Sequence, residues 1–249
     1  MPAHSRGKMK HSSPPETVSS SNPMYLINLT DALSIASSLD DALDEISGLW
    51  EALYDRMDAT DTLWVIAPND YRDGQMWPVA MAAAEAAREE SSLVLKNTIT
   101  LHTWDDRGAD MESAYDEILF LVKDKREYQF QKDRIRTAHV YQGHEWGGER
   151  EKGSSAYHDR DVSRYNEDGK DPGNVWLRED RTQTENQEID ETSSLSLKEA
   201  VRRCVLVGSS EGETVHVVNV DDDLIETITG EDRVTNPLGI KSLLKGDAN

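Results

Sequence analysis

A short basic segment, residues 123–136, carries residue types that could contact a nucleic acid. It reads KDKREYQFQKDRIR and holds six basic and three acidic residues. Basic side chains can bind backbone phosphates while aromatic rings stack on unpaired bases. The side chains that would make these contacts are Lys123, Lys125, Arg126, Tyr128, Phe130, Lys132, Arg134 and Arg136. The alternative interpretation of this basic segment is a charged hairpin that is simply solvated.

The sequence gives little support for a metal centre. His139, His144, Glu145 and His158 lie in a polar, Gly-rich stretch, but no second cluster of ligands accompanies them. Cys204 is the single cysteine, which excludes a disulfide within the chain and a cysteine-based zinc cluster. We therefore expect no metal.

Alternating strand-like and helix-like segments would position these residues. Apolar runs predict strands at 62–67, 93–103, 115–122 and 213–220. Periodic or Ala-rich segments predict helices at 40–57, 75–90 and 196–207. The apolar stripe of the first begins at about residue 31, and Asp31 or Asp40 could cap it, so 31–57 could hold two helices. Gly208 suits a helix end and Gly212 a tight turn. This alternation predicts a three-layered α/β fold with a mostly parallel sheet.

The composition is strongly acidic. The 249 residues include 48 acidic and 27 basic side chains, for a net charge of −21. This composition resembles that of proteins adapted to molar salt, as in halophilic archaea, where the Debye length falls to about 3 Å. An acidic mesophilic protein or a partly disordered one is the alternative. Such a charge excludes DNA binding driven by bulk electrostatics at low salt.

The sequence shows no sign of membrane insertion or export. No apolar run reaches transmembrane length, and the start has no signal-peptide core. We therefore expect a cytoplasmic protein with no membrane partner.

Three stretches resemble the DNA amino-methyltransferases that act on N6 of adenine or N4 of cytosine. Residues 202–220, RRCVLVGSSEGETVHVVNV, resemble the junction that leads into the cofactor-binding strand of that family. Residues 170–176, KDPGNVW, resemble the Asn-Pro-Gly-Asp-Val-Trp segment that precedes the cofactor half. The tetrapeptide Asn22-Pro23-Met24-Tyr25 is similar to the catalytic Asp/Asn/Ser-Pro-Pro-aromatic motif. The strand–helix–strand series over 62–122 resembles the catalytic half.

The resemblance implies a Rossmann-like methyltransferase sheet with helices on both faces and an incomplete cofactor half. It implies site-specific methylation of DNA, as in restriction–modification, with S-adenosylmethionine as the cofactor. The catalytic residues would be Asn22, Pro23 and Tyr25, which hold the target amino group and stack on a flipped base. The cofactor would contact Asp171, Pro172, Gly173, Trp176 and Asp221. A turn leading into a helix is the competing interpretation of the tetrapeptide.

The same resemblance divides the chain into regions. Residues 1–21 are predicted to be a disordered tail, 22–130 the catalytic-half α/β region, and 131–170 a target-recognition-like loop region. Residues 171–235 would form a cofactor-half-like region, followed by a tail at 236–249.

Two departures from the family pattern leave three hypotheses open. Met24 replaces the second proline, and Asp221, Asp222 and Asp223 stand where a Gly-rich loop should receive the cofactor. The chain is a divergent methyltransferase that uses S-adenosylmethionine, or a non-catalytic DNA-binding protein or partner subunit of an active methyltransferase, or a decayed gene product. We expect the chain alone to transfer methyl groups poorly and, if inactive, to need no cofactor.

Overall fold

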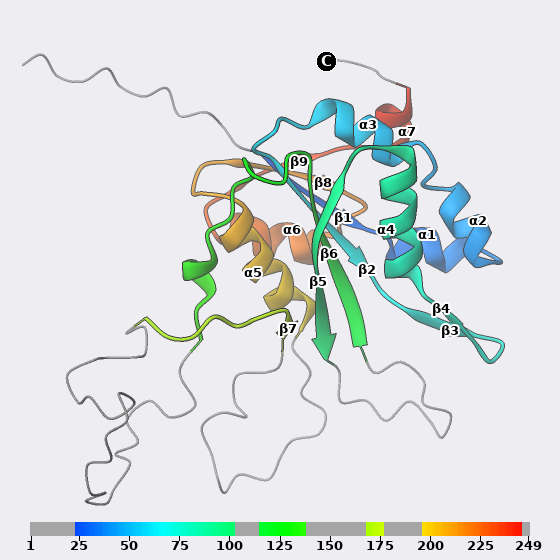
Figure 1. The fold of residues 1–249 in the computed structure, drawn as a ribbon, viewed down its shortest axis with the longest axis horizontal. Coiled ribbons are helices and arrows are strands. Elements are labelled where there is room, and N and C mark those ends of the chain that lie inside the picture. The colour runs from blue at the N-terminus through cyan, green and yellow to red at the C-terminus, as the bar shows by residue number, and fades with distance from the viewer. Residues whose placement is uncertain (1–22, 103–114, 138–167, 177–195, 246–249) are drawn as a thin grey trace, which may run out of the picture.

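The computed structural model describes residues 23–102, 115–137, 168–176 and 196–245 (Figure 1). Several sequence predictions lie outside the described residues. These are the tail at 1–21, Asn22, most of the target-recognition-like region, and the histidines at 139, 144 and 158.

The first half of the chain builds strands and helices in alternation. Strand β1 (Met24–Asn28) is followed by the short helices α1 (Thr30–Ile35), α2 (Leu39–Asp44) and α3 (Leu49–Arg56). Next come β2 (Thr62–Ala67), the small hairpin of β3 (Asp70–Arg72) and β4 (Gln75–Trp77), and helix α4 (Val79–Glu90). Strands β5 (Val94–His102) and β6 (Tyr115–Val122) complete this half.

The second half adds shorter elements. They are the 3₁₀ helix η1 (Lys132–Ile135), strand β7 (Val175–Trp176), helix α5 (Leu197–Gly208), strand β8 (Thr214–Val218), helix α6 (Asp222–Thr229), strand β9 (Val234–Pro237) and helix α7 (Ile240–Leu244).

Seven strands form one sheet in the order β7-β5-β6-β2-β1-β8-β9. Every neighbouring pair is parallel except those of β6, which runs antiparallel to both β2 and β5. The central strands β1 and β2 are buried along their whole length, as expected of parallel strands covered on both faces. The predicted mostly parallel α/β fold is therefore confirmed, and one sheet joins the two predicted halves.

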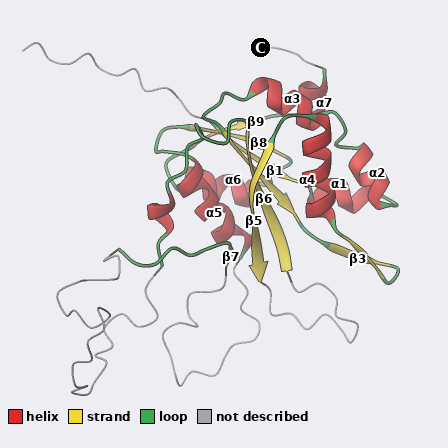
Figure 2. Cartoon of the chain, in the orientation of Figure 1, coloured by secondary structure: helices red, strands yellow, loops and turns green. Residues whose placement is uncertain are grey.

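Helices cover both faces of this sheet. Figure 1 shows α5 and α6 on one side and α1, α2, α3, α4 and α7 on the other, and Figure 2 shows the strands between these two helical layers. Side chains of a strand alternate between the two faces. Tyr25 and Ile27 therefore pack against the helical layer that contains α1–α4, and Met24 and Leu26 pack against the layer of α5 and α6. Two apolar cores result, one on each face.

Helix α5 lies unusually close to the sheet at Gly208. A Cβ atom there would lie 2.7 Å from Nε1 of Trp64 and 3.1 Å from the sulfur of Met24. Gly208 is therefore needed for close packing rather than for a left-handed cap. Gly212, by contrast, has a φ of 76° and makes the tight turn that the sequence predicts.

The element boundaries differ from the sequence prediction in four places. The 40–57 helix is divided into α2 and α3 around Gly48, which has a φ of 76°. The segment 75–90 begins with the hairpin strand β4, because Pro78 delays the start of α4. Strand β1 occupies part of the predicted catalytic tetrapeptide, and β9 and α7 extend into the predicted tail.

Within the described ranges, none of the helices has both the length and the apolar character needed to cross a bilayer.

Candidate functional site

Buried carboxamides lie at the carboxyl ends of two neighbouring strands, where open α/β sheets bind their ligands. Asn28 ends β1 and is 7% exposed, and Asn69 follows β2 and is also 7% exposed. The Asn28 Oδ1 accepts hydrogen bonds from the backbone N–H (3.0 Å) and hydroxyl (2.7 Å) of Thr30, which opens α1. Asn69 Nδ2 donates to Oε2 of Glu117 at 3.2 Å, while its Oδ1 is buried without a partner in the described chain. Thr30 therefore occupies both lone pairs of the Asn28 oxygen, whereas the Asn69 oxygen is left available as an acceptor at the carboxyl ends of the strands.

Sequence reasoning missed both asparagines. The signal that could have found them is a polar residue directly after a buried apolar run, as in MYLIN and TLWVIAPN. β1 was not recognised as a strand, so its carboxyl end could not be located.

The predicted catalytic residues Pro23 and Tyr25 lie at the opposite end of β1, where the strand begins. Tyr25 is the second residue of β1, is 2% exposed, and stacks on His216 with ring centroids 4.7 Å apart. Burial, followed by the nearby charge of Asp61, raises the pKa of Tyr25 to about 12. A ring enclosed in this way cannot stack on an incoming base, so the position of Tyr25 argues against the predicted role.

The link between β8 and α6 stands where a cofactor loop was expected. Asp221 caps α6, because its Oδ1 accepts the backbone N–H of Leu224 at 2.8 Å. Asp223 lies in the first turn of the helix and pairs with Lys198 at 2.9 Å. The link, residues 219–221, contains no glycine, so its backbone carries side chains throughout. Asp221 therefore has a structural role as a helix cap.

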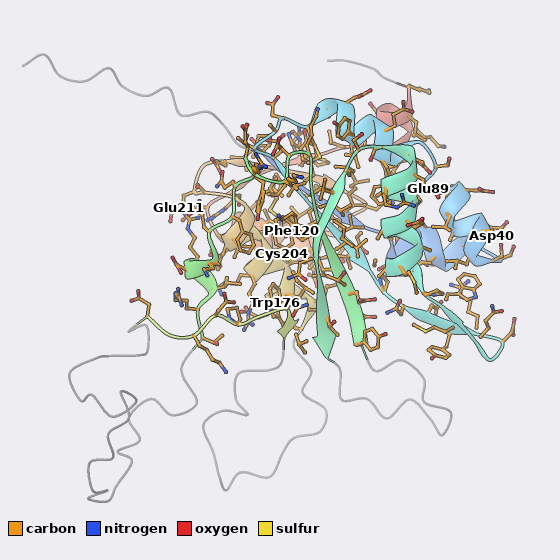
Figure 3. All side chains as sticks on the ribbon, in the orientation of Figure 1. Asp40, Glu89, Phe120, Trp176, Cys204 and Glu211 are labelled. Carbon is orange, nitrogen blue, oxygen red and sulfur yellow. The ribbon has the colours of Figure 1, made fainter. Side chains whose placement is uncertain are left out.

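A pocket of ≈ 350 Å³ opens on the α5 side of the sheet, and we call it the aromatic pocket. Its lining comes from strands β2, β5, β6 and β7, from α5, from η1 and from two loop segments. The lining residues are Trp64, Asn97, Ile99, Phe120, Phe130, Lys132, Ile135, 171–174, Trp176 and Val207. Figure 3 shows Phe120 and Trp176 on the side of the sheet that carries Cys204 of α5. Four of the five predicted cofactor residues and two of the predicted DNA-binding residues thus meet around one cavity.

The Pro-Gly turn, residues 171–176, forms one wall of the aromatic pocket. Gly173 has a φ of 70°, and its N–H donates to Oδ1 of Asp171 at 2.9 Å. The indole N–H of Trp176 donates to the carbonyl of Gly173 at 3.0 Å, and Thr100 of β5 donates to the carbonyl of Asn174 at 2.8 Å. The turn is therefore held against the edge strand β5. The Gly173 N–H, followed by the charge of Lys132, lowers the pKa of Asp171.

The basic segment, residues 123–136, has bends and a turn over 123–127, an irregular stretch over 128–131 and then η1, and it forms no hairpin strands. Half of its cations hold backbone carbonyls. Lys123 donates to the carbonyls of Tyr54 (2.8 Å) and Met57 (2.7 Å), Arg134 to that of Ser209 (2.8 Å), and Arg136 to that of Gly169 (2.9 Å).

The other predicted DNA-binding residues differ in exposure. Lys125, Arg126 and Lys132 are exposed, and Phe130 is 42% exposed. Tyr128 is partly buried and packs edge-on against Phe120. Arg134 is exposed as well but holds the Ser209 carbonyl, so the part of the predicted DNA contact that is exposed and free of such bonds is Lys125, Arg126, Phe130 and Lys132.

The predicted cofactor residues do not form one site. Trp176 belongs to β7, and Asp221 follows β8, five steps away in the sheet order. At about 4.8 Å per step, the two strands are about 24 Å apart. Among the described residues, no group of three or more His, Cys, Asp or Glu could hold a metal ion.

The fold is shared with solved DNA methyltransferases. The N4-cytosine-specific PvuII DNA methyltransferase matches with a TM-score of 0.56 and 7% identity, over 92% of this chain and 80% of its own. TTHA0409 of Thermus thermophilus, a candidate DNA modification methylase, matches with a TM-score of 0.51 and 13% identity, over 88% of this chain and 81% of its own. The chain has the fold of a DNA methyltransferase. No family model and no curated protein matches its sequence.

TTHA0409 has also been solved in a complex with S-adenosyl-L-methionine, a form that matches with a TM-score of 0.49. At these identities, the likeness concerns the fold.

Proposed function

We propose that this chain is a methyltransferase-like protein that binds DNA and does not transfer methyl groups by itself. The observation that carries the proposal is the glycine-free link between β8 and α6, closed by the Asp221 cap. A methyl donor needs close backbone approach at that strand end, which glycine permits and side chains obstruct. Three adjacent carboxylates would also repel the carboxylate of S-adenosylmethionine.

DNA is the proposed partner because of the fold and the exposed part of the basic segment. Lys125, Arg126 and Lys132 are available to phosphates, and Phe130 can stack on a base. An active methyltransferase subunit is a further proposed partner, since it would supply the methyl donor that this chain is poorly suited to hold. A role beside restriction–modification enzymes and a cytoplasmic location follow from that assignment.

An active enzyme is the second candidate, favoured by Asn69. Its unpartnered side-chain oxygen lies just past the carboxyl end of β2, where an acceptor could orient the amino group of a target base. In that case S-adenosylmethionine is the cofactor, and Asn69 replaces Asn22 as the catalytic acceptor. The carboxyl end of β2 is the place for this role, since ligands bind at the carboxyl ends of the strands in an open α/β sheet.

Three measurements on the full chain test the proposal. We expect fluorescence anisotropy to show binding of duplex DNA, titration calorimetry to show no heat with S-adenosylmethionine, and a radiolabelled assay on unmethylated DNA to show no methyl transfer. Robust transfer would overturn the proposal. Comparing Asn69→Ala with Asn22→Ala would then identify which asparagine is the catalytic acceptor.

We also propose adaptation to high salt. A net charge of −21 causes self-repulsion that counterions screen. The thermal unfolding midpoint is expected to rise from low to molar potassium chloride. A midpoint that stays constant or falls would favour an ordinary acidic protein.

A further inference from the structure

We propose that the aromatic pocket binds one unstacked nucleobase. The assignment rests on the proposed DNA-binding function for its source, a base of a DNA strand. Its volume of ≈ 350 Å³ falls within the range of small-molecule sites. The pocket is separate from the strand ends that carry Asn28 and Asn69, because neither residue lines it.

Stacked aromatic rings form one side of this pocket. Trp64 and Phe120 stack with centroids 4.4 Å apart and an interplanar angle of 14°, and Phe120 and Phe130 stack at 5.3 Å and 22°. Trp64 and Phe120 are buried, whereas Phe130 reaches solvent. The series is therefore anchored in the core and ends in a ring that a planar heteroaromatic group can extend. Bases stack on such platforms with little dependence on sequence.

Two carboxamides at the pocket are hydrogen-bonded to each other. Asn97 uses its Oδ1 to accept the N–H of Thr98 (2.9 Å) and Nδ2 of Asn174 (3.3 Å). Asn174 also donates Nδ2 to the carbonyl of Thr98 at 3.0 Å. These bonds orient both amides and leave Asn97 Nδ2 and Asn174 Oδ1 without partners in the described chain. Side-chain amides hydrogen-bond to base edges, so a donor of Asn97 and an acceptor of Asn174 remain for a bound base.

The charge near the opening suits a phosphate next to the base. Lys132 lines the pocket and pairs with Asp171 at 3.5 Å, with both side chains more than half exposed. An exposed pair of this length contributes little stability, so the ammonium can turn to a phosphate at small cost. Lys125 and Arg126 are also exposed and belong to the same basic segment as Phe130 and Lys132.

The test separates a base in DNA from a free nucleoside. Wild-type chain is titrated with a labelled duplex, with a short single strand, and with free deoxyadenosine monophosphate, each at low and molar salt. The variants are Phe130→Ala and Asn97→Ala, with Tyr115→Ala and Leu95→Ala as controls, since these exposed residues do not line the pocket. Thermal melts check that each variant is folded. A second readout is photocrosslinking of a single strand that carries 5-iododeoxyuridine, with the adduct mapped by mass spectrometry.

We expect Phe130→Ala to weaken single-strand binding roughly 5- to 160-fold, as the loss of one base–aromatic stack requires. The effect should persist in molar salt, the controls should bind like the wild type, and the adduct should map to Phe130 or Trp176. Single-strand affinity that is unchanged in both pocket variants, with adducts elsewhere, would overturn the nucleobase site while leaving the proposed function intact. Binding of the free nucleotide with the same variant pattern, but of neither DNA, would support the pocket and overturn the proposed function and the DNA source.

Discussion

The two ends of the parallel strands hold buried polar groups of different kinds. At the carboxyl end, Asn28 and Asn69 are neutral amides. At the amino end, Asp61 is 1% exposed, with Oδ2 accepting the N–H of Asp58 at 2.8 Å and Oδ1 without a partner in the described chain. Tyr25 and His216 stack beside it, on the neighbouring strands β1 and β8.

The difference separates a site from a structural cluster. A neutral amide such as that of Asn69 can offer an acceptor to a ligand at any pH, and it lies at the strand ends where ligands bind in this type of sheet. The amino-end groups are ionisable and enclosed, and burial shifts the pKa of each towards its neutral form. The predicted catalytic Tyr25 belongs to the second group. The following variants test this comparison, from the largest expected effect to the smallest.

Tyr25→Ala should destabilise the protein by about 3–5 kcal/mol, because it deletes a buried ring that is stacked on His216. Tyr25→Phe keeps the ring and is the matched control, expected to cost less than about 1.5 kcal/mol. Urea unfolding followed by fluorescence measures both. If Tyr25→Ala is as stable as the wild type, Tyr25 is not part of the structural cluster.

The carboxyl of Asp61 should make stability depend on pH. Burial raises the pKa of Asp61 to about 7, from an ordinary value of 3.8. Between those values the folded state holds a proton that the unfolded state has released, so stability falls as pH rises through this window. A shift of about three pH units corresponds to at most about 4 kcal/mol. Lys123 favours the charged form, while Asp58 and Glu213 oppose it.

Asp61→Asn isolates this effect from other titrating groups. His216 acts in the opposite direction, since its pKa is lowered by burial and its contribution is lost as pH falls. We expect the variant to gain stability relative to the wild type between about pH 4 and pH 8. The check is urea unfolding across that range. If the unfolding free energies of the two proteins change with pH in the same way, Asp61 is charged in the folded state.

Asp221→Ala should cost about 1 kcal/mol, because it removes the side-chain cap of α6. Asp222→Ala is the neighbouring control and should change stability by less than about 0.5 kcal/mol. Thermal unfolding measures both. A variant that keeps its stability but loses binding of S-adenosylmethionine would make Asp221 a cofactor ligand and would contradict the capping role.

Asn69→Ala should have the smallest effect, about 0.5 kcal/mol, and the effect should not change with pH. The substitution removes one hydrogen bond to Glu117, which lowers stability. It also removes a buried oxygen that has no partner in the described chain, which raises stability, so the two contributions partly cancel. The same unfolding series used for Asp61 measures it. A cost that varies with pH as strongly as that of Asp61→Asn would remove the distinction between the two ends.

The sequence predicts the parts of the fold that have a local pattern. The apolar runs at 62–67 and 115–122 match β2 and β6, and the segment 196–207 matches α5. These elements are predictable because a buried strand or helix has a regular pattern of apolar residues. Strand β9 was missed because Val234–Pro237 is an edge strand with little buried apolar surface. The apolar pattern of an edge strand is too weak to predict the strand from the sequence.

The aromatic pocket shows what a local pattern cannot predict. The sequence analysis singled out Phe130, Lys132 and Trp176, but for two different roles. Trp64, Asn97 and Phe120 join them only because β2, β5 and β6 are neighbours in the sheet. These residues meet because of the strand order, and the strand order cannot be predicted from the spacing of residues along the chain.

The strand order also has a consequence for the making of the protein. Met24 of β1 pairs with Val215 of β8, so the centre of the sheet joins residues that are synthesised far apart in time. Until α5 and β8 leave the ribosome, one edge of β1 and the face carrying Leu26 and Trp64 have no cover. A nascent chain that stalls before residue 196 would therefore be a substrate for chaperones. We therefore expect the nascent protein to become resistant to proteases only when the last quarter of the chain has been synthesised.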